Sequence, residues 1–163
     1  MAADPKFWPT TLARDLMKTH VVTVPETATL AEAVRRLAEN RVSGLPVTDE
    51  AGHVSGVLSI RDILDYESEE GGTRIATMRG FYAETDNLDD DYEFGEIEVD
   101  EDSSATVADV MTAEVFAVNV DTKLHDIAKT LVEHRIHRVL VDEDGKHVGI
   151  ISAMDVLTAL VGG

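Results

Sequence analysis

"GVLSIRD" at residues 56–62 and "GIISAMD" at residues 149–155 share one skeleton: a glycine, two apolar residues, a serine, two further residues and an aspartate. The apolar run before the serine is typical of a buried strand, and the aspartate three residues after the serine is typical of the first turn of a helix. A strand-to-helix junction written twice predicts an internal duplication, so the flanking sequence should also repeat.

The sequence on both sides of the motif does repeat in the same order. Asp15 and Met17 match Asp109 and Met111, and the correspondence continues to the ends of the two motifs. Because methionine fills irregular apolar gaps, we expect Met17 and Met111 to line the core or a cleft. We therefore divide the chain into three segments: residues 1–65, with an N-terminal stretch and the first repeat; the insertion 66–103; and the second repeat, 104–163.

Each repeat shows the same alternation of strand and helix patterns. Residues 21–24 and 115–118 are short β-branched runs, and residues 29–41 and 123–135 carry apolar side chains at helical spacing. Two strands joined by an acidic, glycine-containing turn and a closing helix complete each repeat. One such unit would bury too little surface alone. The sequence thus predicts an α/β protein (α+β) with two β-α-β-β-α repeats, packed sheet to sheet with pseudo-two-fold symmetry.

Composition excludes several classes of protein. The chain has 163 residues and a net charge of −18. It contains no cysteine, and this rules out disulfides and thiolate metal sites. Between Asp65 and Asp102 lie 15 acidic residues against two basic ones, so the acid belongs to the insertion. The sequence lacks the basic patch that is typical of nucleic-acid-binding proteins. No apolar run approaches the roughly 18 to 20 residues that cross a membrane. With no secretory signal pattern, we expect a cytoplasmic protein.

The two motifs, the order of elements and the stretch "SGLPV" before an acidic turn resemble a tandem pair of cystathionine-beta-synthase (CBS) domains, assembled as a Bateman module. The resemblance covers both repeats and leaves out the N-terminal residues and the insertion. It implies a regulatory protein without catalytic activity, which binds AMP, ADP, ATP or S-adenosylmethionine in the clefts between repeats.

The motif residues have chemistry suited to such a ligand. A hydroxyl and free N–H groups at a helix N-terminus can hold phosphate, and a carboxylate can accept hydrogen bonds from both ribose hydroxyls. By the resemblance, Ser59 and Ser152 would contact phosphate or ribose, and Asp62 and Asp155 would bind ribose. The same spacing also fits a capping box, in which the two side chains only satisfy the first N–H groups of the helix. Both interpretations remain open at this stage.

The repeats differ where phosphates would need positive charge. "RIHRVLVDEDG" in the second repeat is similar to a stretch of AMP-activated protein kinase gamma subunits whose His and Arg contact phosphates. This similarity implies that His137 and Arg138 bind phosphate, with Arg61 as a third candidate. The alternative for Arg138 is an exposed charge at the end of a strand.

No metal or catalytic site is expected. His125, His134, His137 and His147 lie in one half of the chain, but no carboxylate at ligand spacing accompanies them. No Ser-His-Asp arrangement, Walker loop or pair of catalytic carboxylates occurs, so an enzyme is not expected.

The closing helices carry apolar stripes that predict a homodimer. No effector domain is attached, so regulation would act on another protein chain, whose identity the sequence does not give. Five of the eight aromatic residues lie in the insertion, which suggests that it folds back as a lid or a partner-docking surface. A calcium site there is not expected. The alternative function is a ligand-independent dimeric scaffold with vestigial nucleotide sites.

Overall fold

The computed structural model of the chain describes residues 10–68 and 102–162. The lid and docking hypotheses concern the insertion 66–103, of which residues 69–101 lie outside the described residues. Within the described part, no helix is both long enough and apolar enough to cross a bilayer.

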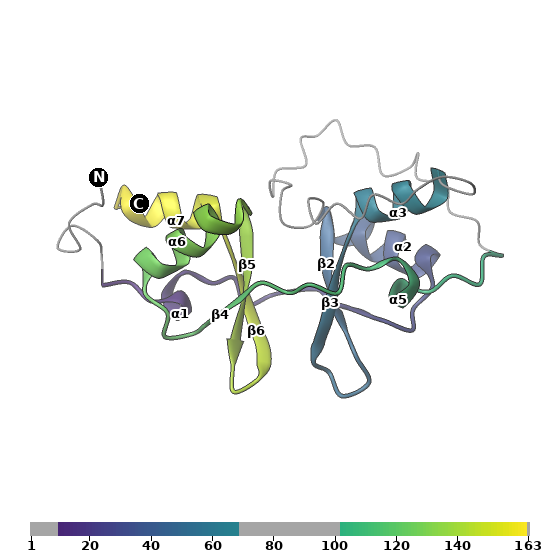
Figure 1. Cartoon of the computed structure of the whole chain (residues 1–163), viewed down its shortest axis with the longest axis horizontal. Helices are drawn as coiled ribbons and strands as arrows, with labels where there is room; N and C mark the ends of the chain where they lie inside the picture. Colours follow the sequence, from purple (N-terminus) through teal and green to yellow (C-terminus); the bar gives the residue numbers. More distant parts are fainter. Residues whose placement is uncertain (1–9, 69–101, 163) are drawn as a thin grey trace. The chain divides into compact units, whose positions relative to one another are not determined.

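The chain forms two compact units (Figure 1). Val22–Val115 make up the first-repeat unit, whereas the second-repeat unit combines Met1–Val21 with Phe116–Gly163. The start of the first repeat, with Asp15 and Met17, therefore folds with most of the second repeat. The three-segment division follows the sequence repeats and stays a prediction.

Each unit has a three-stranded sheet of the same topology. The first strand pairs parallel with the second, and the second pairs antiparallel with the third. A register irregularity recurs at the matching place, between Val47 and Thr48 and between Val141 and Asp142. The strands are β1 (Val24–Pro25), β2 (Gly44–Thr48) and β3 (Val54–Ser59) in the first-repeat unit, and β4 (Ala117–Asn119), β5 (Arg138–Glu143) and β6 (Lys146–Ser152) in the second.

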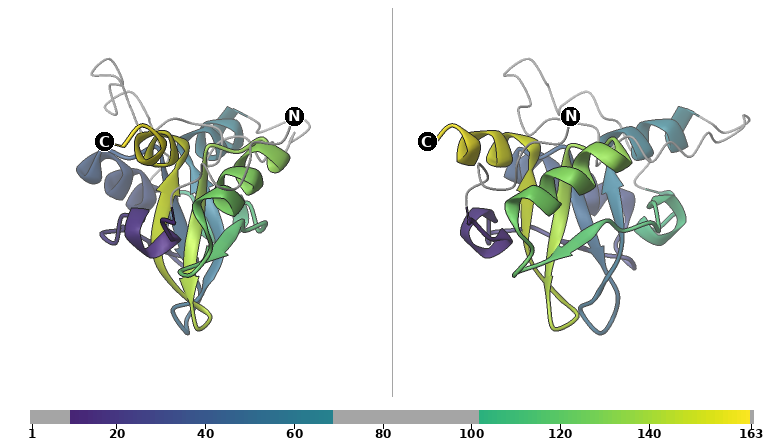
Figure 2. Two further views of the ribbon diagram at one scale, coloured as in Figure 1. Left: turned by 90° about the vertical axis from the view of Figure 1, so that its left-hand side faces the viewer. Right: turned by 60° about the vertical axis from the view of Figure 1, so that its left-hand side comes forward.

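Two helices accompany each sheet and lie on the same face of it (Figures 1 and 2). The first helix of each pair ends in a left-handed residue, Arg41 with φ 51° or Arg135 with φ 55°. These helices are α2 (Leu30–Asn40) and α3 (Ile60–Ser68), and α6 (Leu124–His134) and α7 (Ala153–Leu160). The predicted α/β class and the two β-α-β-β-α repeats are confirmed.

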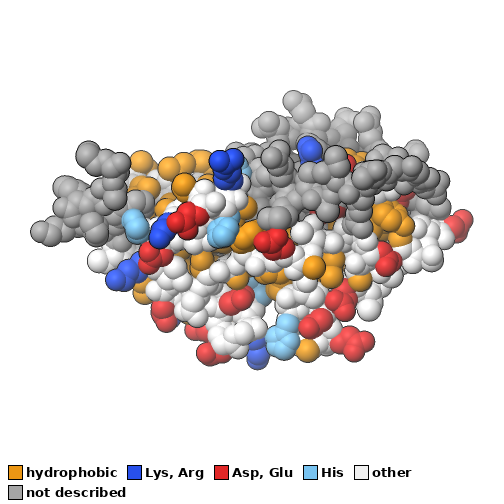
Figure 3. Space-filling view, in the orientation of Figure 1, with side chains coloured by type: hydrophobic (Ala, Val, Ile, Leu, Met, Phe, Trp, Pro, Cys, Tyr) orange, Lys and Arg blue, Asp and Glu red, His pale blue; other side chains and the backbone are white. Residues whose placement is uncertain are grey.

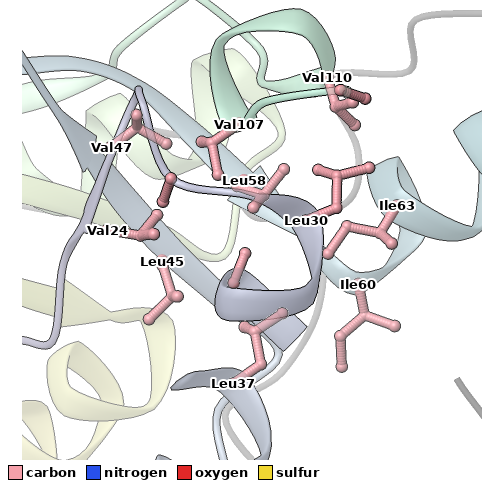
Figure 4. Close-up of a cluster of buried hydrophobic side chains, with 13 residues drawn as sticks. Val24, Leu30, Leu37, Leu45, Val47, Leu58, Ile60, Ile63, Val107 and Val110 are labelled. Carbon is pink, nitrogen blue, oxygen red and sulfur yellow. The ribbon is translucent and has the colours of Figure 1, made fainter. Parts of the chain in front are cut away.

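The helical spacing of apolar residues explains how α2 packs. Leu30, Ala33 and Leu37 lie on one stripe of α2 and are buried, and they belong to one cluster with Leu45 of β2 and Leu58 of β3 (Figure 4). In the second-repeat unit, α6 buries the same stripe with Leu124, Ile127 and Leu131. Each such side chain contributes about 1.5–3 kcal/mol to the stability of the fold when it is fully buried. This burial holds α2 and α6 against their sheets.

Two short helices were not predicted from the sequence. Helix α1 (Ala13–Leu16) lies in the second-repeat unit, where the Arg14 amide donates to the Val120 carbonyl at 3.0 Å. Helix α5 (Val107–Val110) lies in the first-repeat unit, where the Val107 amide donates to the Ala28 carbonyl at 2.9 Å. Each short helix thus lies at the start of one repeat in the sequence and completes the unit that holds most of the other repeat.

Candidate functional site

Both motifs lie at a strand-to-helix junction. Ser59 ends β3 immediately before α3, and Ser152 ends β6 immediately before α7. Both serines are buried, because the preceding strand packs in the core. The first amide of each helix donates to a carbonyl of the neighbouring strand region, Ile60 to Ser43 at 2.9 Å and Ala153 to His137 at 2.7 Å.

The aspartates form a capping box in both units. Asp62 Oδ2 accepts from the Ser59 amide at 2.8 Å and from the Ser59 hydroxyl at 3.0 Å, while the Asp62 amide donates to Ser59 Oγ at 3.1 Å. Asp155 and Ser152 repeat this arrangement at 2.8, 2.9 and 3.2 Å. The structural interpretation of the motif is therefore confirmed. The capping box engages one oxygen of each carboxylate. Whether the same carboxylates bind ribose does not follow from it, and that role stays a prediction.

The motif glycines are required by the short helices. A Cβ at Gly56 would lie 2.7 Å from the Thr112 carbonyl oxygen and 2.9 Å from Met111 Sδ, and a Cβ at Gly149 would lie 2.7 Å from Met17 Sδ. Contacts this short do not occur in a close-packed interior. The two methionines, whose repetition the sequence displayed, thus cover the motif strands, and only glycine leaves room for them.

The residue after each methionine pairs with the motif strand. Lys18 donates its amide to the Ile150 carbonyl at 2.9 Å and accepts from the Ile150 amide at 3.1 Å. Thr112 makes the same pair of bonds with Val57, at 2.9 Å each. The chain entering each unit is therefore fixed beside the second residue of the motif.

The predicted cationic candidates occupy different environments. Arg138 is 4% exposed and pairs across the sheet with Ser152, so the alternative in which Arg138 is an exposed strand-end charge is wrong. At the matching position of the first-repeat unit, Gly44 pairs with Ser59. His137 and Arg61 are exposed. Their contacts with phosphate stay predictions.

The structure thus assembles two sets of predicted site residues, one in each unit. Ser59 and Asp62 are hydrogen-bonded in the first-repeat unit, and Ser152 and Asp155 in the second, with Arg138 beside Ser152. Sequence reasoning missed Lys18, whose Nζ lies 3.8 Å from Asp155 Oδ1. Its only signal was its position directly after the repeated methionine.

Within residues 10–68 and 102–162, the pKa is clearly shifted for two ionisable groups. Hydrogen bonds from the backbone and hydroxyl of Thr106 lower the pKa of Asp109, which forms a third capping box at the start of α5. Burial lowers the pKa of His147, and the nearby Asp142 carboxylate opposes this shift. His147 is therefore neutral near pH 7 and contributes no positive charge. Among residues 10–68 and 102–162, no group of three or more metal-ligating side chains is placed to hold a metal.

A comparison with known families matches the CBS domain twice, at residues 13–69 and 107–162. The CBS domain-containing protein CBSX1, chloroplastic, of Arabidopsis thaliana is 35% identical over 137 residues, which cover 83% of this chain and 57% of that protein. The chain thus spans little more than half the length of this relative.

Solved structures resemble the chain along most of its length. A crystal structure of CBSX2 in complex with AMP aligns with a TM-score of 0.64 and 25% identity, covering 93% of this chain and 96% of that one. The CBS domain pair of protein MJ0100, in complex with 5′-methylthioadenosine and S-adenosyl-L-methionine, aligns with a TM-score of 0.66 and 20% identity, covering 94% and 98%. The second likeness concerns the fold alone.

Proposed function

The chain belongs to the CBS domain family, and from this premise we propose that it is a regulatory module that binds an adenosine-containing ligand and acts in trans on a partner protein. The ligand would be AMP, ADP, ATP or S-adenosylmethionine. The observation that carries the proposal is the twice-matched CBS domain together with the AMP complex of the related CBSX2. The proposal includes no catalytic step.

The motif residues would hold the ligand through the side chains and helix N-termini of the two capping boxes. Each box uses Oδ2 of its aspartate, and a ribose hydroxyl would be bound by the same carboxylate, that of Asp62 or Asp155. Ser59 and Ser152 would contribute at the helix N-terminus, where the dipole favours phosphate. Arg138, His137 and Arg61 would supply positive charge, which an anionic ligand needs on a chain of net charge −18.

Regulation would follow from linkage between ligand and partner. A ligand that favours one arrangement of the protein changes its affinity for a partner, and the partner changes the affinity for the ligand by the same factor. The expected cytoplasmic location stays a prediction, since the relative CBSX1 is named as a chloroplastic protein.

Calorimetric titration of the chain with AMP, ADP, ATP and S-adenosylmethionine tests the proposed function. We expect heat of binding with at least one of the four, and a micromolar complex requires a binding free energy of about 8 kcal/mol. GMP is the matched control, because it keeps ribose and phosphate and changes only the base. Absence of heat with all four adenosine ligands would contradict the proposal.

The second candidate function is a ligand-independent scaffold. It is favoured by the capping boxes, which give both serines and both aspartates a sufficient structural role without a ligand. On this hypothesis the same titrations give no heat, while a partner protein binds equally well with and without nucleotide.

We also propose that the chain forms a homodimer through α7. Met154, Leu157 and Val161 are 61%, 53% and 82% exposed, and Figure 3 shows hydrophobic side chains gathered where Figure 1 draws α7. An apolar helix face of this kind is commonly covered by a second copy.

Glutamate in place of both Met154 and Leu157 should convert this dimer to a monomer. Covering a leucine-sized side chain contributes about 1.5–3 kcal/mol, and burying a carboxylate instead is unfavourable. Sedimentation velocity measures the change. Val132→Glu on α6 is the control, because Val132 is an isolated exposed apolar side chain, 76% exposed. The Val132→Glu variant should remain dimeric. A monomeric parent chain would contradict the proposal.

A further inference from the structure

A partly buried histidine lies in the β5–β6 hairpin, outside the candidate ligand site. His147 on β6 is paired across the strands with Asp142 on β5. Both ring nitrogens of His147 are shielded from solvent, and within residues 10–68 and 102–162 neither has a hydrogen-bond partner. A shielded polar atom without a partner is unfavourable, and a shielded charge is far more so. The closed hairpin therefore favours the neutral ring.

Burial and one nearby carboxylate act on this ring in opposite senses. Burial lowers the pKa of His147, while the Asp142 carboxylate and, after it, the Val141 backbone favour the protonated form. Neither of them is placed to form a hydrogen bond with a ring nitrogen. The effect of burial is the larger one, so the pKa lies below 6.5, the ordinary value for histidine.

The pair lies in a short part of the hairpin that is separated from the rest. A register irregularity directly before Asp142 interrupts the pairing of β5 with β6. Residues 142–147, here called the turn end, contain only two pairs, Asp142 with His147 and Glu143 with Lys146. Because a bulge disrupts the ladder locally, the turn end can open while the other pairs of the hairpin stay closed.

The segments that flank the two strands leave Asp142 as the charge that matters for the ring. Among the described residues, it is the one charged group that contributes to the pKa of His147. On the far side of β5, β4 pairs the uncharged Asn119 with Asp142. On the far side of β6, Lys18 pairs with Ile150, beyond the irregularity. The ionisable pair is thus a local feature of the turn end.

The first-repeat unit has an uncharged pair at the matching place. Its register irregularity is followed by Thr48 opposite Val54, and neither side chain takes up a proton near neutral pH. The histidine of that hairpin, His53, lies outside the paired strands, and its side chain is 56% exposed. Its ring therefore reaches water without any opening, and β2–β3 is an internal control for the response of β5–β6 to acid.

We infer that the turn end of the β5–β6 hairpin is an acid-sensitive element, which opens as a proton from solvent adds to His147. In the open state the ring is hydrated, and its pKa returns toward 6.5. Because the closed state binds the proton less tightly, the balance shifts to the open state as the pH falls below 6.5. His147 is not part of the proposed ligand site, so the element responds to acid with or without a nucleotide.

Native-state hydrogen exchange between about pH 7.5 and 5.5, corrected for the intrinsic pH dependence of exchange, measures this opening. We expect the equilibrium constant for opening of the turn end to rise by up to about tenfold for each pH unit below 6.5, the limit for uptake of one proton. His147→Val copies the first-repeat unit and should flatten this profile. Asp142→Thr removes the opposing carboxylate and should extend the rise to lower pH.

Titration of the His147 ring in the whole chain, followed by NMR, is the second measurement. A midpoint below 6.5 is expected, and a midpoint at or above 6.5 would overturn the inference. Equal pH profiles of the β5–β6 amides in the parent chain and in His147→Val would also overturn it, because the acid response would then belong to other groups. If His147→Val does not fold, the ring titration and a parent profile that rises in β5–β6 but not in β2–β3 decide.

Discussion

Alanine in place of Gly56 is expected to lower the free energy of unfolding of the first-repeat unit by about 1 to 3 kcal/mol, the usual cost of forcing an extra carbon into a packed interior. The added Cβ would meet the Thr112 carbonyl oxygen at 2.7 Å and Met111 Sδ at 2.9 Å. Because Thr112 is hydrogen-bonded to Val57 at both its amide and its carbonyl, the backbone oxygen cannot move without breaking that pairing. Thermal unfolding followed by circular dichroism measures the loss, at about 2–4 °C per kcal/mol for a chain of this size.

Gly149→Ala provides the matched comparison, because its nearest neighbours are all atoms of one side chain. The added Cβ would lie 2.7 Å from Met17 Sδ and 2.9 Å from Met17 Cβ. Shortening Met17 to alanine removes the sulfur and part of the conflict, so the combined loss in Gly149→Ala/Met17→Ala should be smaller than the sum of the single losses. For Gly56 with Met111→Ala, the Thr112 oxygen remains, and relief should be weaker.

Two results would contradict this account of the glycines. One is a Gly56→Ala variant that unfolds at the same temperature as the parent chain. The other is an equal recovery of stability by Met17→Ala in the Gly149→Ala variant and by Met111→Ala in the Gly56→Ala variant. This would mean that the Thr112 carbonyl oxygen obstructs the added Cβ no more than the methionine side chain does. Either result would show that the packing of Met17 and Met111 over the motif strands does not require glycine at positions 56 and 149.

The strands and longer helices could be predicted from the sequence because each has a local cause. The apolar spacing of Leu30 and Leu37 on α2 and the β-branched residues of β3 specify their elements within a few residues. The capping boxes were equally visible, because Ser59 and Asp62 are only three positions apart. In these cases one short window of sequence contains all interacting groups.

The short helices and the environment of the cations could not be predicted in this way. Helices α1 and α5 have four residues each, too few for helical periodicity to appear, and they are held by contacts with distant parts of the chain. Burial of Arg138 and the proximity of Lys18 to Asp155 depend likewise on which strands become neighbours. The repeated methionines did mark these contacts, but a repeat by itself does not tell which unit each copy joins.

Asp62→Ala and Asp155→Ala are expected to weaken binding of an adenosine ligand by at least about tenfold at the altered motif, since a hydrogen bond to a charged group contributes roughly 1.5–3 kcal/mol. Each substitution also removes a capping box and should lower stability by about 1 kcal/mol. A change in binding alone would therefore be ambiguous. Calorimetry with the preferred ligand has to be paired with thermal unfolding of the same variants.

Asp109→Ala separates the two effects, because Asp109 makes the same box with Thr106 but is not part of either motif. Asp109 Oδ2 accepts from the Thr106 amide at 2.8 Å and from its hydroxyl at 3.1 Å, distances that match those at Asp62. Loss of a cap should thus be comparable in all three variants, whereas loss of ligand affinity should appear only at Asp62 and Asp155. If all three lose similar stability and bind the ligand as the parent chain does, the motif aspartates are caps alone, and the ribose-binding role is wrong even though the fold is that of its family.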